Sequence, residues 1–185
     1  GCVPAVAGDP NYPDIVAVAQ FRSVNISRDG GLTFPTSVTV NAPNGYAGGG
    51  GDPTLSFDND GNQYYGYLAS NPAPANANFT LGVFNAVINP QTGAILQNQT
   101  IALETNTTQH DKEWVAADAW EGSPFRNNAY MVWSRLGGTS RILFSRTPNG
   151  GAGWSAPAIL SSNGQGFVWP SEVSVAPNGD VWVGW

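Results

Sequence analysis

A unit of about 60 residues recurs along this chain, and no other feature of the sequence restricts its fold as strongly. Each copy has a polar or acidic start, a short strand-like run, a turn of Asp, Asn and Gly residues, and an aromatic-rich strand-like run. Three copies read GDPTLSFDNDGNQYYGYLA, DKEWVAADAWEGSPFRNNAYMVWSR and WPSEVSVAPNGDVWVGW. The opening CVPAVAGDPNYPDIVAVAQF follows the same plan, and the copies align on Pro53, Trp114 and Ser171. A repeat built of several short strands predicts an array of similar small sheets.

The strand-like runs alternate apolar and polar residues, as in DIVAVAQF, LGVFNAVI and AYMVWSR, and helical periodicity is almost absent. Turn sequences such as DPNYPD, DNDGN and NPQTG separate them. The repeat length is close to that of one four-stranded propeller blade. We therefore expect one all-β domain over residues 1–185, a β-propeller of four-stranded antiparallel blades. About three and a half blades are expected, at roughly 1–45, 50–104 and 110–162, with a partial blade at 168–185.

Charge and composition exclude several classes of partner. The net charge of −6 argues against nucleic acid, because binding phosphates requires a basic face. No run reaches the roughly 20 apolar residues of a membrane span. Cys2 is the only cysteine, so no internal disulfide can form, and a buried thiol or a bond to a partner chain both stay open. Low lysine content, acidity and the Asn-x-Ser/Thr sequons at Asn25, Asn78, Asn98 and Asn106 favour a secreted protein.

The stretch SRDGGLTF, residues 27–34, carries the clearest motif. It resembles the Asp box, Ser-x-Asp-x-Gly-x-Thr-Trp/Phe, of the bacterial-neuraminidase-type (BNR) repeats in sialidase-like β-propellers. Every defined position matches, through Ser27, Asp29, Gly31, Thr33 and Phe34. Such a box suits a hairpin between the third and fourth strands of a blade. There the Asp accepts hydrogen bonds from turn amides and a glycine permits positive φ, while the aromatic ring fills the space between neighbouring sheets.

A degraded second box is expected in SRTPNGGAGW, residues 145–154. Aligned on its serine, it keeps Ser145, Asn149 in place of Asp, Gly151 and Trp154, with two extra residues and a glycine where Thr belongs. The second repeat has NPQTG instead of a box. The resemblance covers the whole chain and implies a six-bladed propeller. We therefore expect further blades from a longer protein or from another chain, with a compact four-bladed ring as the alternative.

In a propeller the first strand of each blade lines the central channel. Ligand sites usually lie on the face that holds the connections between blades and between strands two and three. The charged and aromatic residues at those connections are the candidate site: Arg22, Asp52, His110, Asp111, Lys112, Glu113, Arg135, Trp169 and Glu172. The chemistry expected there is recognition of a glycan or another carbohydrate.

Asp111 and Glu113 are the candidates for general acid and base. If both face the channel, their mutual repulsion raises one pKa and leaves a proton to donate, but they share a face only if the strand has already begun at Asp111. Arg22 and Arg135 can clamp a carboxylate, although surface ion pairs are equally compatible, and Trp169 can stack on a sugar ring.

Other candidates have structural alternatives. Asp52 and Asp118 also suit hydrogen bonds to the amides of a neighbouring blade, and a lone histidine such as His110 is more typical of the surface. The tyrosines of the run QYYGYLA are expected in the core. Five tryptophans are expected to pack between blades, namely Trp114, Trp120, Trp133, Trp182 and Trp185.

The resemblance implies a secreted carbohydrate-active protein that hydrolyses glycosidic bonds with a carboxylate acid or base. Sialidases share an arginine triad, an Arg-Ile-Pro-type first strand and a Tyr–Glu nucleophile pair, and none of these maps onto a position of this sequence. The alternative is a non-catalytic propeller that binds glycan or protein, or a structural subunit of an extracellular assembly. No cofactor or metal site is predicted. The acidic turns DNDGN and APNGD suit a structural Ca²⁺ ion but lack the EF-hand spacing.

Overall fold

The computed structural model describes residues 4–43, 45–71, 81–103, 109–148 and 150–185. Cys2, the sequons at Asn78 and Asn106, and Asn149 of the second box lie outside this part. The described chain is all-β and contains no helix, hence none that is long and apolar enough to cross a membrane. Its strands are β1 (Ala5–Gly8), β2 (Val16–Gln20), β3 (Ser23–Ser27), β4 (Thr36–Thr39), β5 (Gly48–Phe57), β6 (Gln63–Ser70), β7 (Leu81–Ile88), β8 (Ile95–Leu103), β9 (Gln109–Ala117), β10 (Ala129–Leu136), β11 (Arg141–Thr147), β12 (Ala158–Ile159), β13 (Glu172–Val175) and β14 (Val181–Gly184).

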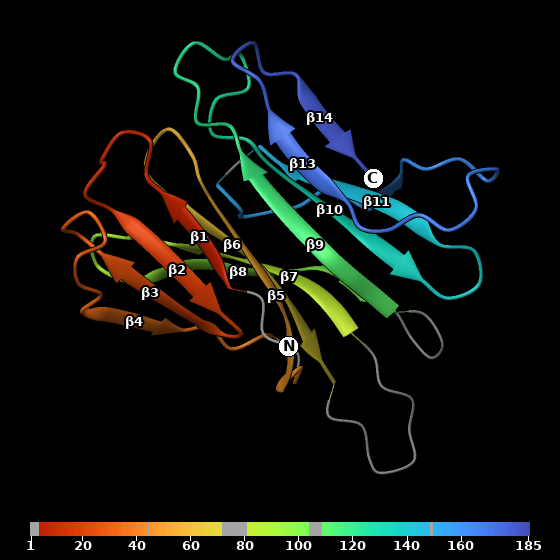
Figure 1. Ribbon diagram of the computed structural model, residues 1–185, viewed down its shortest axis with the longest axis horizontal. Coiled ribbons are helices and arrows are strands. Elements are labelled where there is room, and N and C mark those ends of the chain that lie inside the picture. The colour runs from red at the N-terminus through yellow and green to blue at the C-terminus, as the bar shows by residue number, and fades with distance from the viewer. Residues whose placement is uncertain (1–3, 44, 72–80, 104–108, 149) are drawn as a thin grey trace.

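The strands form four antiparallel sheets, each from one contiguous stretch of chain (Figure 1). Three sheets have four strands, in the orders β1-β2-β3-β4, β5-β6-β7-β8 and β9-β10-β11-β12, and the fourth pairs β13 with β14. No sheet of the described residues closes into a barrel. The prediction of an all-β chain of hairpin-connected antiparallel strands is therefore confirmed. Each sheet uses neighbouring strands because tight turns such as NPQTG, where Asn89 Oδ1 accepts from the amide of Gln91 at 2.9 Å, return the chain at once.

The first strands of the sheets lie next to one another, with β1 against β5, β5 against β9, and β9 against β13 (Figure 1). Side-chain hydroxyls of β5 bridge to the backbone of β9. Thr54 Oγ1 accepts from the Val115 amide at 3.2 Å, and Ser56 Oγ accepts from the Ala117 amide at 2.9 Å. The edge of β9 that pairs with no strand of its own sheet thus has part of its backbone satisfied by side chains of the neighbouring sheet.

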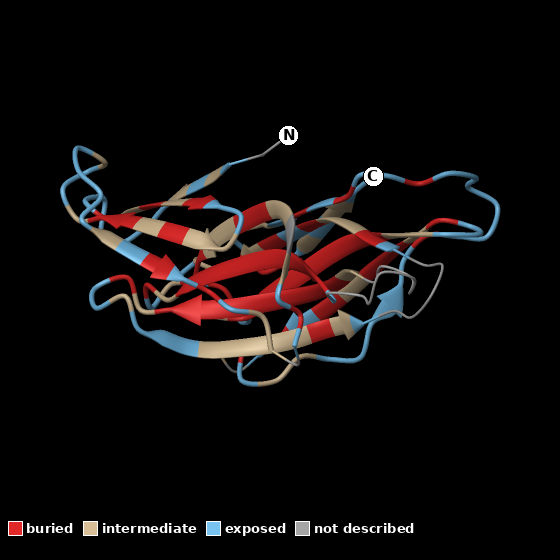
Figure 2. Ribbon diagram, turned by 90° about the horizontal axis from the view of Figure 1, so that it is seen from below, coloured by how far each residue is buried: buried red, intermediate tan, exposed pale blue. Residues whose placement is uncertain are grey.

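Three apolar clusters fill the spaces between successive sheets, and the buried residues lie along the middle strands (Figure 2). Tyr65 and Tyr67 stack at 4.9 Å in the cluster between the first two sheets, while Tyr64 points from the other face of β6 into the second cluster. The prediction that these tyrosines belong to the core is confirmed, since all three are fully buried. Alternation along a strand that is covered on both faces explains why one run supplies two cores.

The prediction that five tryptophans pack between sheets is wrong for Trp114, Trp182 and Trp185, and it holds in part for Trp120, whose Nε1 donates to the Val175 carbonyl of the neighbouring sheet at 2.9 Å. Only Trp133 is buried, whereas Trp114, Trp120, Trp182 and Trp185 are exposed. Trp182 lies on the face of β14 opposite Val181 and Val183, which pack against the third sheet. A strand covered on one face only leaves its alternate side chains in solvent.

Aspartates close the first hairpins of three sheets. Asp9, Asp58 and Asp118 directly follow β1, β5 and β9 and are buried. Each accepts hydrogen bonds from backbone amides two to four residues further on, for example from the Trp120 amide to Asp118 Oδ1 at 3.1 Å. We expected Asp118 to accept from amides of a neighbouring sheet, but it accepts from amides of its own hairpin, which lie closer to it.

The SRDGGLTF box forms the loop between β3 and β4, as predicted. Asp29 Oδ1 accepts from Ser27 Oγ at 2.6 Å and from the Thr33 amide at 2.9 Å, and Asp29 Oδ2 accepts from Thr33 Oγ1 at 2.6 Å. These bonds lower the pKa of Asp29 to about 2, led by the bond from Ser27. Gly31 has a φ of 89°, which only glycine adopts readily. Phe34 is 39% exposed, so the prediction that it plugs the space between sheets is wrong.

The second box begins at Thr147, not at Ser145. Thr147 ends β11 as Ser27 ends β3, and the Gly151 amide donates to Thr147 Oγ1 at 3.3 Å as the Gly31 amide donates to Ser27 Oγ at 2.8 Å. In this alignment TPNGGAGW needs no insertion, keeps Gly151 and the final aromatic residue, and has Thr, Asn and Gly at the Ser, Asp and Thr positions. Its Trp154 packs against the second core. Ser145 lies inside β11, where its Oγ donates to the Ser155 carbonyl at 2.7 Å. The alignment on serine fails because threonine supplies the same hydroxyl.

Candidate functional site

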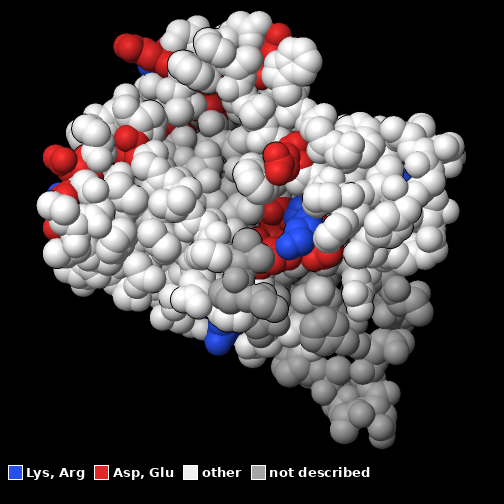
Figure 3. All heavy atoms as spheres, viewed as in Figure 1, with Lys and Arg blue, Asp and Glu red and all other residues white. Residues whose placement is uncertain are grey.

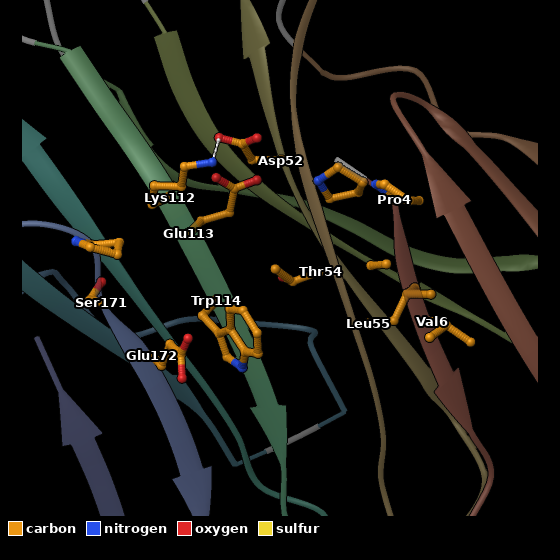
Figure 4. A pocket seen from close by; sticks show the side chains of 13 residues that line it. Pro4, Val6, Asp52, Thr54, Leu55, Lys112, Glu113, Trp114, Ser171 and Glu172 are labelled. Atoms are coloured by element: carbon orange, nitrogen blue, oxygen red, sulfur yellow. Dashed lines mark ion pairs between the residues drawn. The ribbon is translucent and has the colours of Figure 1, made fainter. Parts of the chain in front are cut away.

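The four first strands enclose a cavity of about 470 Å³. We call it the central cavity. Figure 3 shows charged side chains gathered in a hollow of the face seen in Figure 1, most of which is otherwise uncharged apart from the loop ends. The lining residues come from β1, β5, β9 and the segment that enters β13: Pro4, Ala5, Val6, Asp52, Pro53, Thr54, Leu55, Lys112, Glu113, Trp114, Pro170, Ser171 and Glu172 (Figure 4). Its size lies within the range of about 300–1,000 Å³ typical of ligand pockets.

Two β-bulges shape this cavity. Asp52 and Lys112 have φ values of 48° and 51°, in the left-handed region that disfavours side chains other than glycine. Each lies at a register shift, in the pairing of β5 with β6 and of β9 with β10. The bulges turn the two side chains toward each other, and Lys112 Nζ contacts Asp52 Oδ2 at 2.8 Å (Figure 4). Strained backbone of this kind, at about 1–3 kcal/mol for each residue, is typical of functional sites.

Glu113 is the most unusual group of the central cavity. Its side chain is 1% exposed, and neither carboxyl oxygen has a hydrogen-bond partner among the described residues. Burial raises the pKa of Glu113 well above its ordinary value, and the charges of Asp52 and Asp111 raise it further while that of Lys112 lowers it. Figure 4 shows the carboxyl group beside the Asp52–Lys112 pair. Glu113 therefore holds its proton to a higher pH than an ordinary glutamate does, and it lines an open cavity.

Asp111 does not line the central cavity. Its Oδ2 accepts a hydrogen bond from Trp169 Nε1 at 2.9 Å. The strand has begun at Gln109, but the bulge at Lys112 falls between the two carboxylates, so the period of two that would put them on one face is interrupted. The structure thus brings Glu113 into the cavity and leaves Asp111 at its edge, tied to Trp169.

His110 is fully buried, and the expectation of a surface histidine is wrong. Its ring lies edge-on to Trp133, with centroids 6.0 Å apart, and neither ring nitrogen has a hydrogen-bond partner among the described residues. Burial, with a smaller contribution from the positive charge of Arg135, lowers the pKa of His110 to about 4. His110 is neutral at neutral pH and does not line the central cavity.

Neither candidate arginine lines the central cavity. Arg22 donates from Nη1 to the Ala47 carbonyl at 3.1 Å. Arg135 lies opposite His110 in the pairing of β10 with β9. Of the remaining candidates, Asp52, Lys112 and Glu172 line the cavity. Trp169 does not line it and is hydrogen-bonded to Asp111.

Sequence reasoning did not place Trp114 and Ser171 in the site. Trp114 is 41% exposed and lines the cavity, and Ser171 is buried with an Oγ that has no partner among the described residues. The signal was present, because Pro53, Trp114 and Ser171 are the positions that align the repeats and all three line the cavity. The first strands lie side by side, so equivalent positions of the repeats come together around one cavity.

The described residues hold no cluster of three or more His, Cys, Asp and Glu side chains able to bind a metal ion. In the turn of residues 58–62, a candidate for Ca²⁺, Asp58 Oδ1 accepts from the amides of Asp60 and Asn62 at 3.0 and 2.9 Å, and Asp58 Oδ2 accepts from Asn62 Nδ2 at 3.0 Å.

The sequence matches no known protein family and no curated protein. Among solved structures, a protein of unknown function from Dyadobacter fermentans DSM 18053 is similar, with 11% sequence identity and a TM-score of 0.35 over 93% of this chain and 71% of that chain.

Proposed function

We propose that this chain forms part of a sialidase-like β-propeller whose first strands line a glycan-binding channel. Three features support the proposal. Three sheets follow one another as contiguous four-stranded meanders, the first strands of all four sheets are neighbours, and two boxes close the loops between third and fourth strands. The central cavity, where those strands meet, is then part of the channel.

The proposed activity is hydrolysis of a glycosidic bond in a secreted setting, with Glu113 as the proton donor. The observation that carries this proposal is the buried Glu113 carboxyl, which faces the cavity with neither oxygen hydrogen-bonded to a described residue. A carboxylic acid that keeps its proton near neutral pH can transfer it to a leaving-group oxygen. Glu172, which lines the same cavity from β13, supplies the second carboxylate that such hydrolysis requires.

The charge of the central cavity selects a neutral glycan. Lys112 is the only cation among the lining residues, and it is paired with Asp52. Because Lys112 and Asp52 offset each other, the Glu172 carboxylate leaves the lining with a net negative charge. A sialic acid carboxylate would be repelled there, because bidentate arginine recognition is missing from the lining. The proposed substrate class is therefore neutral, in contrast to that of true sialidases.

Two substitutions test the proposal on an array of neutral and sialylated glycans, with binding and reducing-end release measured on each. Glu113→Gln and Glu172→Gln should each lower turnover at least a hundredfold while far-UV circular dichroism stays unchanged. Glu121→Gln, in an exposed turn outside the cavity, is the matched control and should keep full turnover. Turnover of a sialylated glycan in preference to neutral ones would contradict the charge argument. The absence of binding to every glycan would refute the proposed function.

Non-catalytic glycan binding is the second candidate. The observation that favours it is the engagement of Asp52 with Lys112 and of Asp111 with Trp169, which leaves Glu172 alone to assist Glu113. This function predicts binding without turnover on the same array. Affinity would then fall with Trp114→Ala and stay unchanged with Glu113→Gln. The two functions are separated by turnover alone, so one experiment decides between them.

A further inference from the structure

We propose that an aromatic surface beside the central cavity is a second sugar subsite. The ligand is then a β-1,4-linked oligosaccharide and not a single sugar. This inference rests on the proposed glycan-binding function and specifies its substrate class. It depends on a second hollow, which we call the rim cavity, formed by Gln165, Phe167, Val168, Trp169 and Trp185, with a volume of about 300 Å³.

The rim cavity presents aromatic rings to solvent. Phe167 is 74% exposed, Trp169 42% and Trp185 46%. None of the five lining residues carries a charge. Other exposed aromatic side chains occur among the described residues, but these three lie around one hollow, and grouped apolar surfaces of this kind mark binding sites. An uncharged aromatic hollow favours a neutral ligand with apolar faces.

Hydrogen bonds fix the segment that carries these rings. The Val168 amide donates to Ser140 Oγ at 2.7 Å, and the Val168 side chain is buried. Trp169 is held from the other side by its bond to Asp111 Oδ2 at 2.9 Å. Binding therefore does not have to order the segment first, which reduces the entropic cost of association.

The residues of the rim cavity lie next to those of the central cavity in the chain. Pro170, Ser171 and Glu172 directly follow Trp169 in the chain and line the central cavity. Trp185 directly follows Gly184, which is the register partner of Glu172. The buried Ser171 hydroxyl, with no partner among the described residues, lies on this connecting segment and can bond to a ligand that passes from one cavity to the other.

The chemistry of β-1,4-linked glucose and N-acetylglucosamine chains suits this arrangement. Their equatorial substituents leave flat faces of C–H groups, which pack on aromatic rings, while hydroxyl groups project at the edges. One sugar can stack on Trp114 in the central cavity and the next on Trp169 or Phe167 in the rim cavity. Gln165 and Ser171 supply hydrogen bonds at the edges of such a chain.

Isothermal titration calorimetry with cello-oligosaccharides and chito-oligosaccharides of one to six units tests this inference. Affinity should rise about tenfold or more between the monosaccharide and the longer chains, because a second ring adds a stacking contact. Phe167→Ala and Trp169→Ala should each remove about tenfold of that gain. Phe167 is so exposed that its substitution leaves the fold intact, so the test does not depend on Trp169→Ala folding. Trp182→Ala, an exposed tryptophan of β14 outside both cavities, is the matched control and should bind every chain as the wild type does.

Equal affinity for all chain lengths would overturn the inference, and so would an unchanged length dependence in Phe167→Ala. If neither series binds but another glycan of the array does, the second subsite is wrong and the proposed function stands. If nothing on the array binds, both are wrong.

Discussion

Acid should destabilise this protein through its only histidine. The folded state holds the pKa of His110 at about 4, whereas the ordinary value is 6.5. Between these two values the unfolded chain binds a proton at His110 that the folded chain does not bind, so the free energy of unfolding falls as the pH falls. The gap of about 2.5 pKa units, at about 1.4 kcal/mol for each unit, gives a loss of about 3 kcal/mol. This loss is complete near pH 4 and absent above pH 6.5.

Urea denaturation of the wild type and of His110→Gln between pH 4 and pH 8 measures this loss. The free energy of unfolding of the wild type, relative to the variant, should fall by about 3 kcal/mol from pH 7 to pH 4. The comparison cancels the contributions of the carboxylates, which both proteins share. Because the chain has one histidine, its single imidazole resonance also reports the pKa directly by NMR. A midpoint near 6.5, or a pH-independent difference between the two proteins, would refute the burial argument.

Three further predictions concern single residues. Relative to Glu113→Gln, the wild type should lose about 1.4 kcal/mol of unfolding free energy for each pH unit above 4.5, up to the raised pKa of Glu113. The reason is that in this pH range Glu113 ionises in the unfolded chain and stays protonated in the folded one. A difference in unfolding free energy between the two proteins that does not change with pH in urea melts would contradict this. Gly151→Ala should lower the free energy of unfolding by several kcal/mol more than Gly150→Ala does. Both glycines have positive φ, but only the alanine at 151 places a methyl group 2.5 Å from a side chain of the neighbouring sheet. Equal losses in urea melts would disprove this close approach. Ser27→Ala should raise the pKa of Asp29 from about 2 toward 3.8 in a carbon-detected NMR titration, and a carboxyl that still titrates near 2 would show that the box bonds do not set it.

The repeat and the alternation of residues predicted the central strands well. QYYGYLA falls within β6, LGVFNAVI coincides with β7, and AYMVWSR falls within β10. The outer strands gave weaker signals, because their side chains are largely exposed and need no apolar period. β8, with the sequence ILQNQTIAL, shows this plainly, since only one of its nine residues is buried.

The candidate site was predicted only in part. Asp52, Lys112, Glu113 and Glu172 line one cavity, because they lie on neighbouring first strands. The direction of each side chain could not be predicted from the sequence, because a bulge adds one residue to a strand and reverses the faces of the residues after it. His110 shows the same limit, since polar neighbours in the chain gave no sign that it faces a core.

The hydroxyls of Thr54 and Ser56 have a consequence for the behaviour of the protein in concentrated solution. A strand with unsatisfied amides on its open side can recruit a strand from another molecule and begin a fibrous aggregate. On β9 two of those amides are already engaged by hydroxyls from β5, so that an incoming strand would have to displace them. These two small polar side chains thus disfavour the addition of a strand from another molecule. A charged residue at the same place would disturb the packing of the neighbouring strands.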